Sequence, residues 1–336
     1  MRISVFPKGD LDALSQDRSM TVFEWITKAA PLPADGLELY SGMFWQGDDD
    51  YLDAIGEALT AEGFEMPMLC TSPDFTHPDT SVRAAEFDRQ VDMMRFTRHL
   101  GGPGASTRVL SGQKYPEVSR EQGVAWVVEA YQRLLPIARE LDITLGMENH
   151  YKDGSWAYVE FAQRGDVFRE IVDAIDDRVH FGVQFDPSNA ITAGMDSADF
   201  LDQVIDRVVT MQASDRFLAP GTSLADLRQA DGTIGYSPAL QHGVIGKGLN
   251  DYPRIFRTLA AAGYDGWVSI EDGVNGMGEM HESVLFLREA RDLYFGGSTA
   301  IRVENQERAR AEAGLPSLAR PQLGEDALAA GREAAR

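Results

Sequence analysis

The sequence predicts an α/β fold, a (β/α)8 TIM barrel with a long loop after strand 7 and a helical or flexible C-terminal tail. Three observations predict it. Short apolar runs alternate with amphipathic stretches, which is typical of a parallel sheet covered by helices. The candidate strands number eight, as a closed barrel of this kind requires. The length of 336 residues is within the range of one such barrel.

The elements follow one another in regular order along the chain. The strands are expected to begin near Ile3, Leu37, Met66, Thr107, Ile143, Phe181, Val208 and Trp267. Helical patterns between them include residues 122–140, 167–175, 198–205 and 252–262. Gly263 follows the last of these patterns and predicts a helix C-cap.

Two segments interrupt the alternation. Residues 215–250 form a long connection after the seventh strand, rich in Gly, Pro and Ser. Loops of this length are usually functional or disordered, and one at the catalytic end of a barrel could act as a lid. After the barrel domain, residues 1–297, comes a C-terminal extension, residues 298–336. Its residues 302–313 are charged and alanine-rich, which favours a helix, and the extension is either an irregular end or a subunit contact.

Composition excludes some classes of protein. The chain has 53 acidic and 31 basic residues and a formal net charge of −22, which argues against a nucleic-acid surface. No stretch is apolar enough to span a membrane. The single cysteine, Cys70, excludes an internal disulfide and fits a reducing compartment. With no basic leader at the first residues, we expect a cytoplasmic protein.

Polar side chains stand where four predicted strands end: Glu148, Asp186, Gln212 and Glu271. Read with period 2, each lies on the face opposite the apolar residues of its strand, so all four point to the barrel interior if helices cover the apolar face. Carboxylate and amide oxygens suit one hard divalent ion, Mn²⁺ first, with Mg²⁺, Fe²⁺ or Co²⁺ as alternatives, whereas Zn²⁺ prefers more nitrogen or sulfur. The competing interpretation is a scatter of buried or rim carboxylates.

His150 belongs to the densest polar cluster, GMENHYKDG. It follows Glu148 by two positions and therefore points to the same side, above the metal. An imidazole with an ordinary pKa of about 6.5 is suited to take a proton from a bound substrate. The alternatives are a further metal ligand or a hydrogen-bonding contact to substrate.

Four further residues are candidates for substrate binding: Glu38, His77, Asn189 and His242. Glu38 precedes Tyr40 by two positions on the second strand. Asn189 follows Asp186 closely and either bonds a sugar hydroxyl or caps the next helix. His242 stands in the long loop, and His77 is either close to the substrate or a turn residue.

Five sequence strings together resemble the xylose-isomerase-like barrels, the sugar isomerase and epimerase superfamily that also includes metal-dependent AP endonucleases. The strings are GMENH, GVQFDPSNA, MQASD, GKGLNDY and GYDGWVSIEDG. The resemblance implies one divalent ion held by Glu148, Asp186, Gln212 and Glu271. Gln212 and Asn189 stand where histidines are usual. With fewer imidazole nitrogens, the site is a harder donor set and suits zinc less well. In the epimerases two metal-bound glutamates form the acid–base pair, and His150 is an additional candidate here.

A narrower similarity is to the large (alpha) barrel subunit of bacterial C-glycoside deglycosidases. It rests on ENHYKDG, on residues 222–236 and on FGGST. The resemblance implies a lyase that works with a small β-rich partner on 3-oxo-C-glycosides. Removal of the C2 proton by His150 would give an enolate that the metal stabilises, and the aglycone would leave from C1.

Three other functions stay open. A keto-sugar or inositol-derivative isomerase, epimerase or dehydratase would use the same enolate chemistry. An AP endonuclease is disfavoured by the net charge of −22. A non-catalytic binding barrel would bind sugar without needing a metal.

Overall fold

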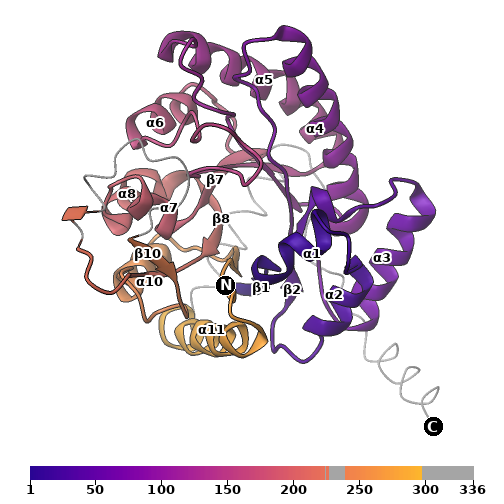
Figure 1. Ribbon diagram of the computed structural model, residues 1–336. Coiled ribbons are helices and arrows are strands. Elements are labelled where there is room, and N and C mark those ends of the chain that lie inside the picture. Colours follow the sequence, from indigo (N-terminus) through magenta and orange to yellow (C-terminus); the bar gives the residue numbers. More distant parts are fainter. Residues whose placement is uncertain (224, 227–238, 297–336) are drawn as a thin grey trace.

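The protein is a barrel of parallel strands inside a ring of helices (Figure 1). The computed structural model describes residues 1–223, 225–226 and 239–296. Its main sheet has the order β2-β1-β11-β8-β7-β6-β5-β4-β3. The two end strands of that order, β2 (Gly36–Leu37) and β3 (Leu39–Tyr40), are consecutive in the chain and separated only by Glu38. Counted as one strand, they close the nine-stranded sheet into the predicted eight-stranded barrel.

The remaining elements confirm the predicted alternation. The other barrel strands are β1 (Arg2–Val5), β4 (Met68–Cys70), β5 (Ser106–Val109), β6 (Thr144–Glu148), β7 (Phe181–Phe185), β8 (Val208–Ala213) and β11 (Trp267–Ile270). The helices are α1 (Leu11–Ser15), α2 (Val22–Ala29), α3 (Asp49–Ala61), α4 (Thr80–Gly101), α5 (Arg120–Leu141), α6 (Gly165–Asp173), α7 (Pro187–Thr192), α8 (Ser197–Val204), α10 (Tyr252–Ala261) and α11 (Met277–Ala290). Each of the eight barrel strands begins within two residues of its predicted start.

The core lies between the strands and the helices. The apolar residues of β7, such as Val183 and Phe185, are fully buried. Tyr131 of α5 packs edge-on against Phe181 at 5.0 Å between ring centroids. Its hydroxyl donates to the backbone oxygen of Val109 at 2.7 Å, which ties α5 to β5. Because period 2 sends these apolar side chains outward to the helices, the intervening polar side chains point into the barrel.

The connection after β8 contains an antiparallel hairpin that the sequence did not predict. Its strands are β9 (Arg216–Leu218) and β10 (Leu240–His242). Part of the expected lid, residues 224 and 227–238, and the whole of the expected helix at 302–313 lie outside the described residues. Gly263 follows α10 with φ +71°, as a C-cap glycine should. None of the helices in the described part combines the length and hydropathy that a bilayer crossing requires.

Candidate metal centre

Three carboxylates meet at the carboxyl ends of the barrel strands. Glu148 is the last residue of β6, Asp186 follows β7, and Glu271 follows β11. One oxygen from each lies within 4.8 Å of the other two, and all three residues are buried. Active sites of this barrel type lie at the same end of the strands. Closure of the barrel therefore converts three separate strand ends into one acidic cluster.

Two cations neutralise part of this negative charge. Arg108 of β5 donates from Nη1 to Oε2 of Glu148 at 2.9 Å, and both side chains are almost fully buried. Lys8, just after β1, donates from Nζ to Oε1 of Glu271 at 2.7 Å. When all three carboxylates are ionised, these two cations leave the cluster with an excess of negative charge for an additional cation.

Asn189 has a different role from the helix cap that was its alternative assignment. The N-cap of α7 is Asp186, whose Oδ1 accepts from the backbone nitrogen of Asn189 at 2.9 Å. The Asn189 side chain instead donates from Nδ2 to Oε1 of Glu148 at 2.9 Å. The cap interpretation was wrong because the carboxylate at the strand end already occupies that position. Both oxygens of Glu148 therefore accept hydrogen bonds from fixed donors.

The pKa values of the three carboxylates shift in opposite directions. Burial, with the neighbouring Glu271 charge, raises the pKa of Asp186 to about 7. Burial also raises the pKa of Glu148, although Arg108 opposes the effect. Burial works against ionisation of Glu271 too, but Lys8, Arg108 and His150 outweigh it and lower its pKa to about 2. Without a metal ion the cluster tends to keep protons, which a divalent cation would displace.

Gln212 lies in β8 and pairs with Ser269 of β11. Glu271 comes two residues after Ser269, so the two point to the same face. The Gln212 side chain donates from Nε2 to Oε2 of Glu38 at 2.9 Å. Its Oε1 is buried and has no hydrogen-bond partner among the described residues, and the same holds for Oδ2 of Asp186. Buried polar atoms normally have a partner.

These observations fit a hard divalent ion. The carboxylate cluster and the unpartnered amide and carboxylate oxygens offer only oxygen, the donor that Mn²⁺ and Mg²⁺ prefer. Glu148, Asp186 and Glu271 could hold the ion, with Gln212 as the fourth side chain. The metal's identity stays a prediction.

His150 lies on the loop after β6 and is 6% exposed. Burial raises the pKa of Glu271, and His150 is near enough to help lower it, after the larger effects of Lys8 and Arg108. Its Nδ1 is 3.7 Å from Oε2 of the buried Glu160, beyond hydrogen-bond range. Glu160 is itself fixed, since Oε1 accepts from the backbone nitrogen of Ser111 at 2.7 Å. His150 therefore stands between an ordered carboxylate and the acidic cluster.

The remaining predicted residues lie in different places. Glu38 is completely buried and contacts Gln212. His242 is on β10, where Nδ1 is 2.7 Å from Oδ1 of Asp272, the residue after Glu271. His77 shapes the turn before α4, because its Nδ1 accepts from the backbone nitrogen of Asp79 at 3.0 Å. The structure thus brings Glu38 to the centre and places His242 beside it, whereas His77 has the turn role that was its alternative.

Arg108, Lys8 and Glu160 were missed by the sequence reasoning. The position of Arg108 inside the short strand Ser106–Val109 could have indicated a site residue, since a charge buried in a barrel strand needs a partner. Lys8 and Glu160 stand in connecting segments, where charged residues are common, so no comparable signal marks them in the sequence.

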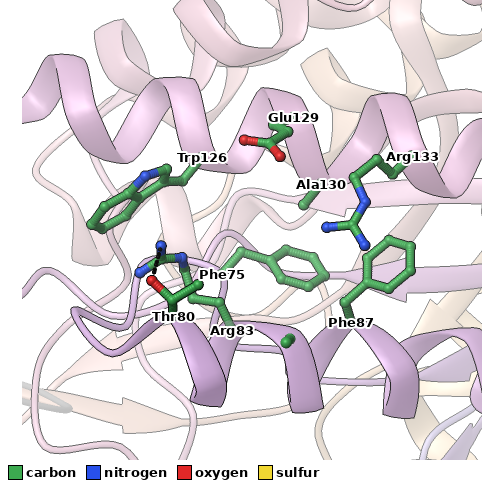
Figure 2. Close-up of a pocket in the computed structure, with 9 residues that line it drawn as sticks. Phe75, Thr80, Arg83, Phe87, Trp126, Glu129, Ala130 and Arg133 are labelled. Atoms are coloured by element: carbon green, nitrogen blue, oxygen red, sulfur yellow. Dashed lines mark hydrogen bonds between the residues drawn. The ribbon is translucent and has the colours of Figure 1, made fainter.

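A hollow of about 310 Å³ lies away from this centre, between α4 and α5. Figure 2 shows two guanidinium groups against aromatic rings there, Arg83 over Trp126 and Arg133 over Phe87. None of the acidic-cluster residues lines it. The hollow belongs to the outer helix layer and has no part in the metal centre.

Residues 26–290 match a family model described as xylose isomerase-like TIM barrel. A solved D-tagatose 3-epimerase-like protein superposes with TM-score 0.67 and 17% identity, covering 88% of this chain and 99% of its own. A 3-keto-D-glucoside 4-epimerase from E. coli gives TM-score 0.61 and 15% identity over 87% of this chain and 99% of its own. The IolI protein, solved with a zinc atom, gives TM-score 0.66 and 14% identity over 88% and 99%. No curated protein matches the sequence. At these identities the similar structures establish the fold.

Proposed function

Because the chain belongs to the xylose isomerase-like TIM-barrel family, we propose that it is a metal-dependent enzyme acting on keto-sugars. Its reaction begins with removal of the proton next to the carbonyl. The observation that carries the proposal is the buried cluster of Glu148, Asp186 and Glu271, with His150 beside it. A divalent ion in that cluster would supply Lewis-acid stabilisation of negative charge on a substrate oxygen.

His150 is the base in this proposal. Its ring is held in the protein interior close to the cluster, and an imidazole exchanges protons near neutral pH. For a 3-oxo-C-glycoside, His150 takes the proton from C2. The electron pair of that C–H bond then forms the C1–C2 double bond, and the aglycone leaves from C1 with the electrons of the broken bond. A proton returned to the aglycone completes the balance.

The environment of the two glutamates favours this single-base lyase over a two-glutamate epimerase. Both oxygens of Glu148 accept hydrogen bonds, from Asn189 and from Arg108. Glu271 is ion-paired with Lys8 at 2.7 Å. Although burial opposes it, this ion pair helps lower the pKa of Glu271 to about 2, which makes Glu271 a poor proton acceptor, whereas a two-glutamate mechanism needs both carboxylates to exchange protons. Keto-sugar isomerisation, epimerisation or dehydration remains the second candidate, supported by the epimerase names among the similar structures.

The test follows the substrate and the C2 proton separately. The protein is loaded with Mn²⁺ and incubated in deuterated water with a 3-keto C-glucoside, with and without a small β-rich partner subunit. We expect release of aglycone, faster with the partner. Deuterium at C2 without aglycone loss would indicate an isomerase or epimerase instead of a lyase. Neither product at full metal occupancy would refute both.

A further inference from the structure

The amide of Gln212 is fixed on its nitrogen side. Nε2 donates to Oε2 of Glu38 at 2.9 Å and lies 3.6 Å from Sγ of Cys70, a second, weaker acceptor. All three side chains are completely buried. The Sγ of Cys70 also donates to the same Glu38 oxygen, at 3.9 Å. The nitrogen of the amide therefore has two acceptors on one side, which decides which way the group faces.

The oxygen side of the same amide is left without a partner. Oε1 of Gln212 is buried and accepts no hydrogen bond from any described residue. Leaving such a group unpaired costs about 1–3 kcal/mol. A cation held by the neighbouring carboxylates would satisfy this oxygen and Oδ2 of Asp186, which is also unpartnered within the described part.

We propose that Glu38 is a positioning residue of the metal centre: it holds the Gln212 amide so that the carbonyl oxygen faces the cation. The inference rests on the proposed metal centre and assigns Glu38 a role other than the substrate contact expected from the sequence. An amide can rotate by half a turn, and its nitrogen end would repel a cation. By holding the nitrogen, Glu38 keeps the oxygen available and makes the fourth ligand a hard oxygen donor.

Two substitutions of Glu38 separate this role from the alternatives. Glu38→Leu removes the acceptor, whereas Glu38→Gln keeps an amide oxygen that can still accept from Gln212. With Mn²⁺ alone as the probe, calorimetry should show binding weakened roughly 10- to 100-fold in the leucine variant. The glutamine variant should bind nearly as the unmodified protein does. In a double-mutant cycle, Glu38→Leu should weaken binding no further once Gln212→Leu is present.

Several results would overturn the inference. Unchanged binding in Glu38→Leu would leave Glu38 without a positioning role, and equal losses in both variants would mean that the charge of Glu38 acts directly. If the unmodified protein binds no Mn²⁺, the metal centre itself fails, which is a different result.

A crystal of the unmodified protein soaked in Mn²⁺ tests the inference even if the leucine variant does not fold. We expect Oε1 of Gln212 on the ion and Glu38 outside the coordination sphere. A Glu38 oxygen on the ion would refute the assignment.

Discussion

Stability of the metal-free protein should fall as pH rises, and Asp186 gives the magnitude. Its pKa is about 7 in the folded protein, compared with an ordinary 3.8. The folded state therefore keeps a proton that the unfolded chain loses between these values. The stabilisation is fully present below about pH 4 and is lost as pH rises through about 7. At about 1.4 kcal/mol for each pH unit, the loss is on the order of 4 kcal/mol.

Other groups alter this trend in known directions. Glu38, whose pKa burial raises to about 8, extends the loss of stability to higher pH. Glu271, with a pKa lowered to about 2 by Lys8 and Arg108 against the effect of burial, stays charged throughout and adds no slope above pH 5. Burial lowers the pKa of His242, so this group opposes the trend just below pH 6.5.

Urea unfolding in a chelating buffer measures the effect, with tryptophan fluorescence as the signal at pH 5, 6, 7 and 8. The free energy of unfolding should fall across this series. The matched control is Asp186→Asn, which keeps the size of the side chain but cannot ionise. Its free energy of unfolding should fall less steeply with pH. Saturating Mn²⁺ should stabilise the protein increasingly as pH rises, because the ion binds the deprotonated cluster. A flat profile, or an equal slope in Asp186→Asn, would refute the reasoning.

Five substitutions test the centre more directly. Glu148→Gln or Glu271→Gln should lower the metal content measured by elemental analysis, since a neutral amide binds a cation more weakly than a carboxylate; full occupancy would contradict their ligand role. His150→Ala should retain the ion and slow C2 deuterium exchange by about 10²- to 10⁴-fold, and loss of the ion would make His150 a ligand. Lys8→Met should tighten Mn²⁺ binding in calorimetry by removing a competing cation from Glu271; weaker binding would show that Lys8 supports the site. Gln212→His should shift the measured preference from Mn²⁺ towards Zn²⁺, and an unchanged ratio would place the side chain outside the coordination sphere.

Local patterns were sufficient for the fold and for the acidic cluster. The period-2 alternation in β6 and β7 places Glu148 and Asp186 on the interior face, and the carboxyl ends of parallel strands share one edge of the barrel. The roles of Asn189 and Glu38 were not accessible in the same way. A strand pattern tells which face a side chain occupies, but it does not tell which side chain lies opposite.

The sequence by itself determined the barrel, the order of its strands and the three carboxylates at their ends, because these depend on spacing within short segments. Only the tertiary structure decided the partners. Glu38 and Gln212 are 174 positions apart, and Lys8 and Glu271 are 263 positions apart. Contacts of this kind exist only once the first and last strands pair and the cylinder closes. That pairing sets which charge is neutralised and which oxygen is left for a cation.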